Sequence, residues 1–149
     1  MYEKDTEFAK HKKALELLAS MYPNTLGLRI FPVFGESDHG TFIMQAIRSM
    51  KKGESPIVYG DGTQGRDFIN IQEVIHQIMR SLDNTGIIDI GGGTLTEFND
   101  IVDMINEHLG TDIKPKYINA PKDYSEGIKA NNPYPVGHSI SQHIKFLCQ

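Results

Sequence analysis

Hydrophobic residues recur at the three- and four-residue spacing of amphipathic helices in several segments of the chain. The spacing predicts helices over residues 7–21, 41–53, 71–82 and 96–110, and a shorter helix over 139–147. Gly53 and Gly110 are predicted to end two of these helices, because glycine readily adopts the conformation found just after a helix. In the first helix the apolar positions are Phe8, Ala14, Leu15, Leu18 and Met21.

Two of the helices carry recognisable start signals. Asn70 is predicted to cap the third helix, and Glu73 three residues later makes the pair a variant of the capping box. Thr96 is predicted to cap the fourth, with acidic residues in its first turn. The apolar stripe of the third helix consists of Val74, Ile75, Ile78, Met79 and Leu82.

Strand-like runs separate the helices. The apolar run from Leu26 to Phe34 predicts a strand that is buried on both faces. Shorter strands are predicted at residues 56–60, 66–71, 86–93 and 114–120, and the proline- and glycine-containing stretch 121–139 predicts an irregular tail. This alternation of helices and strands predicts an α/β fold with a partly parallel sheet.

Composition narrows the function classes. The chain has 149 residues, a net charge of −4 and 39% hydrophobic residues, which predicts one globular domain with no general affinity for nucleic acid or anionic lipid. Cys148 has no cysteine partner, and no apolar run is long enough to cross a membrane, so a cytoplasmic protein is predicted. His138, His143 and Cys148 lack zinc-ligand spacing, so they are predicted to be surface residues and no metal site is predicted.

Residues 60–65 read GDGTQG, a literal G-x-G-x-x-G. When this pattern binds a dinucleotide it leads directly into a helix, whose N-terminus meets the phosphate. Here Gly65 is followed by RDFINI, in which apolar residues indicate an extended chain. The glycines are therefore predicted to form a loop between two strands, and not to bind a cofactor phosphate.

The longer string PIVYGDGTQGRDFINIQEV closely resembles a segment of the NAD-dependent sugar-nucleotide epimerases and dehydratases, the extended short-chain dehydrogenase/reductases. LRIFPVFG resembles the turn into the substrate lobe of that family, IIDIGGG resembles a later turn, and FAKHKKALE resembles its Y-x-x-x-K helix. The resemblance covers roughly residues 7 to 120 and is to the C-terminal part of the family. It implies a partial Rossmann-like sheet, with residues 1–35 as a remnant of the Rossmann lobe and 36–149 mainly as a small α/β substrate-binding lobe.

The resemblance also implies roles for individual residues. Lys12 would hold the ribose of NAD and act in catalysis, and Phe31, Pro32 and Val33 would lie near the nicotinamide. Arg66 would bind the diphosphate of a nucleotide-sugar substrate, with Tyr59 and Asn70 as further substrate contacts. The implied chemistry is transient oxidation of a sugar hydroxyl by NAD, followed by inversion or loss of water.

Each residue also has a structural interpretation. Arg66 could pair with its neighbour Asp67, and Lys12 could belong to a solvated helix face. For Tyr59 the interpretation as a core aromatic residue is favoured, and for Asn70 helix capping is favoured.

The chain departs from the family pattern in several ways. It contains no second G-x-G-x-x-G, and Phe8 occupies the position of the tyrosine that serves as general acid/base. Tyr2 cannot replace it, because no lysine follows four residues later. Pro32 and Phe34 stand where the family has asparagine and tyrosine. Each of these side-chain changes removes a polar group.

Three functional hypotheses follow. The chain is the substrate-binding half of an epimerase/dehydratase, inactive alone; or a non-catalytic module that binds sugar nucleotides or regulates an oligomer; or one half of a split enzyme. The strand at 26–34 and the first helix lack neighbouring sheet strands in this sequence, and an unpaired apolar edge promotes association. We therefore expect a homo-oligomer or pairing with a chain that supplies a Rossmann half.

Overall fold

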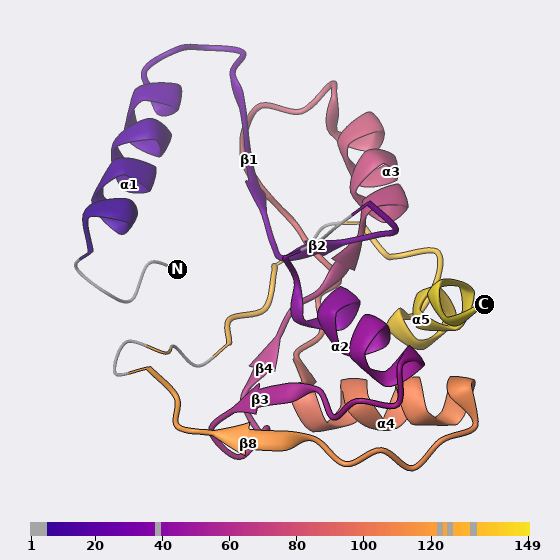
Figure 1. Cartoon of the computed structure of the whole chain (residues 1–149). Helices are drawn as coiled ribbons and strands as arrows, with labels where there is room; N and C mark the ends of the chain where they lie inside the picture. The colour runs from indigo at the N-terminus through magenta and orange to yellow at the C-terminus, as the bar shows by residue number, and fades with distance from the viewer. Residues whose placement is uncertain (1–5, 38–39, 122–123, 125–126, 132–133) are drawn as a thin grey trace.

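The computed structural model describes residues 6–37, 40–121, 124, 127–131 and 134–149. Its helices are α1 (Glu7–Ser20), α2 (Phe42–Lys51), α3 (Ile71–Ser81), α4 (Phe98–Leu109) and α5 (Ile140–Cys148) (Figure 1). Its strands are β1 (Leu26–Ile30), β2 (Val33–Phe34), β3 (Ile57–Tyr59), β4 (Gly65–Arg66), β5 (Ile69–Asn70), β6 (Gly86–Ile90), β7 (Thr96–Glu97) and β8 (Lys116–Ile118). None of the described helices is long and apolar enough to cross a bilayer.

The strands form four separate pairs, of which three are parallel. β1 lies parallel to β6, with Leu26 opposite Gly86 and Ile30 opposite Ile90. β2 pairs with β5 and β3 with β8, both parallel, whereas β4 and β7 are antiparallel. The predicted α/β class with a partly parallel sheet is confirmed.

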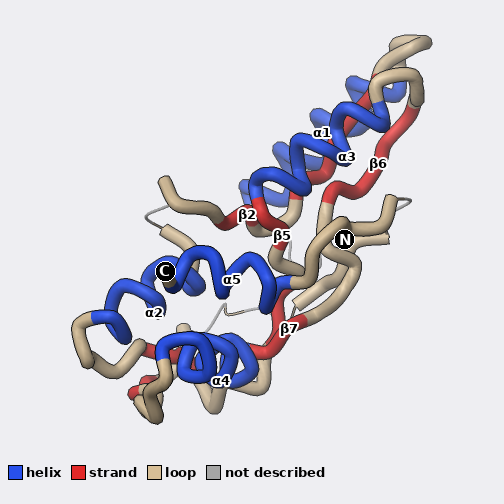
Figure 2. The backbone as a smooth tube through the Cα atoms, turned by 90° about the vertical axis from the view of Figure 1, so that its right-hand side faces the viewer, coloured by secondary structure: helices blue, strands red, loops and turns tan. Residues whose placement is uncertain are grey.

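The β1–β6 pair lies between α1 and α3 (Figures 1 and 2). The prediction of one strand from Leu26 to Phe34, buried on both faces, is wrong. The chain turns at Phe31–Pro32, and the side chain of Ile30 is 51% exposed. Ile30 is exposed because, among the described residues, β1 has a neighbouring strand on one edge only.

Helices α2, α4 and α5 pack together beside the β3–β8 pair and enclose the main core (Figures 1 and 2). Phe42 and Phe98 meet edge to face at 4.6 Å, and Phe68 reaches the same cluster. Gly53 and Gly110 follow α2 and α4 with φ of 76° and 66°, as the predicted helix ends require. The core consists of Phe34, Ile43, Met44, Ala46, Ile47, Met50, Val58, Phe68, Phe98, Ile101, Val102, Ile105 and Ile144.

The predicted apolar face of α1 is not buried, and that of α3 is buried only at Val74 and in part at Ile78. In α1 only Ala9 is buried, and all five of the predicted face residues remain exposed. In α3, Val74 packs inward, whereas Met79 is 64% exposed. The buried side of α3 is instead mostly polar and consists of Glu73, Val74, Gln77 and Ser81.

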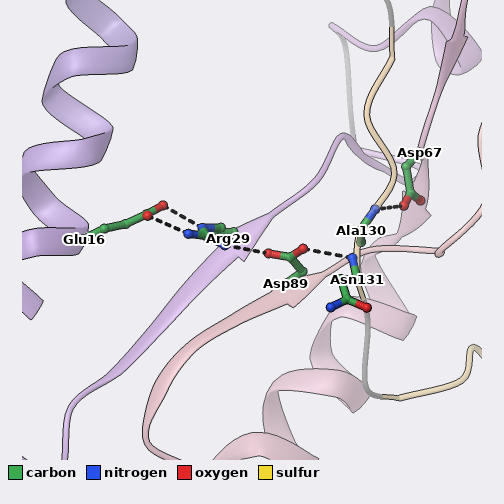
Figure 3. Close-up of polar contacts among 6 residues, drawn as sticks. All are labelled: Glu16, Arg29, Asp67, Asp89, Ala130 and Asn131. Atoms are coloured by element: carbon green, nitrogen blue, oxygen red, sulfur yellow. Dashed lines mark hydrogen bonds and ion pairs between the residues drawn. The ribbon is translucent and has the colours of Figure 1, made fainter. Parts of the chain in front are cut away.

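The predicted irregular tail has no strand or helix in its described part, yet it is firmly attached to the rest of the chain. Asp67 accepts hydrogen bonds from the backbone N–H of Ala130 (2.7 Å) and from Gly92 and Gly93 in the turn after β6. Asp89 accepts from the N–H of Asn131 at 2.9 Å (Figure 3). Buried carboxylates therefore satisfy the backbone of a segment that has no ladder partners of its own.

A chain of ion pairs joins α1 to the same segment. Arg29 on β1 donates to both carboxylate oxygens of Glu16 on α1, each at 2.7 Å, and reaches Asp89 on β6 at 3.4 Å (Figure 3). Because Asp89 also binds Asn131, α1, β1, β6 and the tail are connected through a single polar path.

We predict that Asp67→Asn lowers the free energy of unfolding by about 1–3 kcal/mol, because an amide cannot accept all three backbone N–H groups and leaves one unsatisfied. Urea denaturation of the variant and of Asp83→Asn, at an exposed position, provides the comparison. The control is expected to stay within about 0.5 kcal/mol of the parent. Equal effects of the two substitutions would contradict the assignment.

Candidate functional site

The glycine loop 60–65 lies against the start of α4. The carbonyl oxygens of Gly62 and Gln64 accept from the backbone N–H of Asn99 and Phe98, and the Asn99 side chain donates to Asp61 O. The loop leads into β4 and not into a helix, as predicted. Its carbonyl oxygens bind the first N–H groups of α4. These are the N–H groups that would face a phosphate if the pattern bound a dinucleotide at this helix.

These contacts also correct the predicted start of α4. The N-cap residue is Glu97, with no side-chain cap bond, whereas Thr96 belongs to β7. The orphan N–H groups of the first turn are satisfied by loop carbonyls instead of a threonine hydroxyl. A short stretch of sequence cannot reveal that loop carbonyls replace the threonine cap, because these partner atoms lie more than thirty residues away in the chain.

Arg66 lies beside aromatic rings. Its guanidinium carbon is 5.0 Å from the ring centre of Tyr124 and 5.7 Å from that of Phe98, which is within cation–π range. One guanidinium nitrogen donates to Gly65 O at 2.8 Å. The alternative interpretation, a surface pair of Arg66 with Asp67, is wrong, because Asp67 is fully buried and binds backbone N–H groups.

Tyr59 extends this group of residues. Its ring centre lies 5.5 Å from that of Tyr124, and 41% of the residue is exposed, so its interpretation as a core aromatic residue is wrong. We call Arg66, Tyr59, Tyr124 and Phe98 the Arg66 cluster. Tyr124 was missed by sequence reasoning, because it is a lone aromatic residue in an irregular segment with no informative spacing.

The described residues also line a cleft of about 920 Å³ between β2, the start of α3 and the end of α5. Asn70 and Val33 are among its lining residues, whereas Lys12, Phe31, Pro32, Arg66 and Tyr59 are not. Asn70 accepts from Gln72 N at 2.9 Å, which confirms helix capping. The predicted capping box is wrong, because the Glu73 carboxylate turns to the tail. The lining consists of Val33, Phe34, Gly35, Glu36, Ser37, Asn70, Ile71, Gln72, His138, His143, Phe146 and Leu147.

Glu73 and His143 meet near this cleft. The carboxylate of Glu73 accepts from the N–H of Gly137 and His138, and lies 3.5 Å from His143 Nε2. Burial opposes ionisation of Glu73, but these two N–H groups and His143 outweigh it and lower its pKa. Burial lowers the pKa of His143 despite the nearby carboxylate, so the imidazole is neutral at pH 7. The prediction that His143 is a surface residue is wrong, since it is 6% exposed; His138 is exposed as predicted.

The residues expected to contact NAD occupy two places. Lys12 is exposed on α1, with Nζ 5.3 Å from the ring centre of Phe8, which is 67% exposed. Phe31 and Pro32 follow β1, where Phe31 N donates to Ile90 O and Pro32 O accepts from Ile69 N. Tyr2 lies outside the described residues.

Residues 4–91 match the family model of the NAD dependent epimerase/dehydratase family. The chain belongs to this family. It is 35% identical over 126 residues to a UDP-glucuronate 4-epimerase of Thermodesulfobacterium geofontis, covering 77% of this chain and 38% of that protein. It is 34% identical over 97 residues to a putative UDP-glucose 4-epimerase of Methanocaldococcus jannaschii, covering 64% and 30% of the two chains.

Solved structures of epimerases and dehydratases share the fold. A UDP-N-acetylglucosamine 4-epimerase from Methanobrevibacter ruminantium, in complex with UDP-N-acetylmuramic acid, matches with a TM-score of 0.84 and 25% identity. The match covers 97% of this chain and 53% of that one. A dTDP-glucose 4,6-dehydratase from Bacillus anthracis matches with a TM-score of 0.85 at 16% identity and covers 97% and 51% of the two chains. This chain thus spans a third to a half of the length of these family members.

The described residues present little of what a dinucleotide site needs. Lys12 is exposed on α1 beside Phe8, which carries no hydroxyl. The one G-x-G-x-x-G loop is bound to α4 through its carbonyls. The described residues therefore do not fit the whole cofactor.

We predict that the free energy of unfolding falls between pH 7.5 and pH 5.5 in a way that depends on His143. A histidine whose pKa is lowered by folding stabilises the fold above its ordinary pKa of about 6.5, and that stability is lost as the pH falls below this value. His143→Gln should flatten this slope in chemical denaturation. The control is His76→Gln, at an exposed position of α3, which should leave the slope unchanged.

Proposed function

We propose that this chain is the substrate-binding part of a sugar-nucleotide epimerase or dehydratase, and that Arg66 binds the diphosphate of a nucleotide sugar. The observation that carries the proposal is the position of the Arg66 guanidinium, at 5.0 Å from Tyr124, with the partly exposed Tyr59 beside that ring. A planar guanidinium can donate two parallel hydrogen bonds to phosphate oxygens, and aromatic faces can stack on a base. Relatives with the same fold include complexes with UDP-sugars.

The surroundings of Arg66 support an interaction with an anion. Among the described residues, no carboxylate lies within ion-pair distance of its guanidinium. Asp67, the adjacent carboxylate in the sequence, is directed to three backbone N–H groups instead. The charge of Arg66 is therefore not neutralised by an ion pair with a described residue, and its aromatic neighbours restrict where it can point.

Catalysis by these 149 residues alone is not part of the proposal. Phe8 has no proton to exchange with a sugar hydroxyl, and the glycine loop uses the carbonyl oxygens of Gly62 and Gln64 to accept from the first N–H groups of α4. We propose that the chain binds substrate without turnover. A cofactor-binding half would supply a phosphate-binding loop, but it would not replace the hydroxyl that is missing at Phe8.

The test is calorimetric titration with UDP, UDP-glucuronate and UDP-N-acetylglucosamine. Arg66→Ala should weaken binding of the preferred ligand by about 10-fold or more, because a charge-assisted hydrogen bond contributes about 1.5–3 kcal/mol. Arg66→Lys should recover only part of the loss, since an ammonium cannot bind bidentately.

The matched control is Arg80→Ala, which removes an exposed arginine of α3 and should leave the affinity unchanged. If the parent chain binds none of the three ligands, or if both alanine variants weaken binding equally, the proposed role of Arg66 is wrong.

A further inference from the structure

The tail is attached to the residues on either side of Arg66 in the sequence. On one side, Asp67 accepts from the N–H of Ala130 at 2.7 Å (Figure 3). On the other side, Gly127 lies so close to Gly65 that a β-carbon on Gly127 would overlap the carbonyl oxygen of Gly65. The tail therefore passes over β4 with one point of attachment before Arg66 and one after it.

The carbonyl oxygen of Gly65 is also a hydrogen-bond partner of Arg66. One guanidinium nitrogen of Arg66 donates to this oxygen at 2.8 Å. The same oxygen is the atom on which Gly127 packs. A single backbone carbonyl thus contacts both the tail and the cation, so a displacement of the tail at Gly127 disturbs the acceptor of Arg66.

The tail contributes to the orientation of Arg66 through a second contact. Tyr124 belongs to the tail, and its ring centre lies 5.0 Å from the guanidinium carbon of Arg66. A long side chain that is already held in place loses less rotational freedom when it binds a ligand. The contacts that fix the tail beside Arg66 therefore favour the binding of an anion by this side chain.

Position 127 requires glycine for a steric reason. The φ of Gly127 lies outside the left-handed region, so an alanine could adopt its backbone conformation. An added β-carbon would lie 2.9 Å from Leu95 Cδ2, which can move by a change of rotamer. The Gly65 oxygen cannot move in this way, because it belongs to the backbone of β4, which is paired with β7. An alanine at position 127 would therefore push the tail away from Arg66.

We propose that Gly127 is a positioning residue for Arg66. Because it has no side chain, the tail packs on the Gly65 carbonyl, and the guanidinium of Arg66 is held against Tyr124 in an orientation that suits a diphosphate. This inference rests on the proposed function, and it assigns to the tail a role in ligand affinity as well as in folding.

The experiment measures UDP binding by calorimetry in a double-mutant cycle. Gly127→Ala should weaken the binding of UDP by about 3–10-fold, because Arg66 then has to be ordered by the ligand itself. In the Arg66→Ala background the same substitution should cause no further loss. The matched control is Gly137→Ala, another tail glycine with φ outside the left-handed region. Its added β-carbon would meet the Glu73 carboxylate at 3.2 Å, and the affinity should be unchanged.

A second measurement needs no ligand. The NMR signal of the Arg66 Nε–H group senses the nearby rings of Tyr124 and Phe98. It should move toward the value of an unstructured arginine in Gly127→Ala and stay unchanged in Gly137→Ala. If the parent chain binds no UDP, the proposed function fails, and this signal alone decides the positioning role.

Three results would overturn the proposal. The first is an Arg66 signal that does not move in Gly127→Ala. The second is an unchanged affinity of Gly127→Ala when the parent chain does bind UDP. The third is an equal loss of affinity in the parent and Arg66→Ala backgrounds, because Gly127 would then act independently of Arg66.

Discussion

The structure depends on buried carboxylates that bind the backbone of the tail. Asp67, Asp89 and Glu73 come from three different parts of the chain, and each accepts at least one N–H from residues 130–138. An irregular segment cannot satisfy its own backbone N–H groups, and burying a carboxylate without hydrogen-bond donors is costly. The hydrogen bonds between the two satisfy both groups. Charge-assisted bonds of this kind are roughly twice as strong as neutral ones.

The same arrangement decides what Arg66 can do. Consecutive residues of an extended chain point to opposite sides, so Asp67 turns inward to the backbone amides while Arg66 turns to Tyr124 and Phe98. A pairing between the two neighbours would remove the tail attachment and would neutralise the charge of Arg66. The tail also carries Tyr124, so the segment that Asp67 anchors supplies an aromatic partner of Arg66.

Local patterns predicted the elements well and their partners poorly. The helix at α4 and its end at Gly110 follow from apolar spacing and one glycine, because both signals lie within a few residues. The polar contacts of α3 do not, since Glu73 binds amides 64 and 65 residues away. Apolar spacing predicted buried faces for α1 and for the strand at 26–34, whereas the predicted face of α1 and the side chain of Ile30 are exposed. This exposure agrees with the expectation that these two elements lack neighbouring sheet strands in this sequence.

The loop at residues 60–65 separates two properties that the glycine pattern is often assumed to carry together. Gly60 and Gly62 have φ of 71° and 81°, so glycine is needed for the curvature of the turn. Whether the loop offers N–H or C=O groups to a partner depends on the element beside it. In this chain that element is the N-terminus of α4, whose N–H groups bind the loop carbonyl oxygens. A glycine-rich sequence therefore specifies a turn. Whether that turn binds anions or N–H donors depends on the element that packs beside it in the fold.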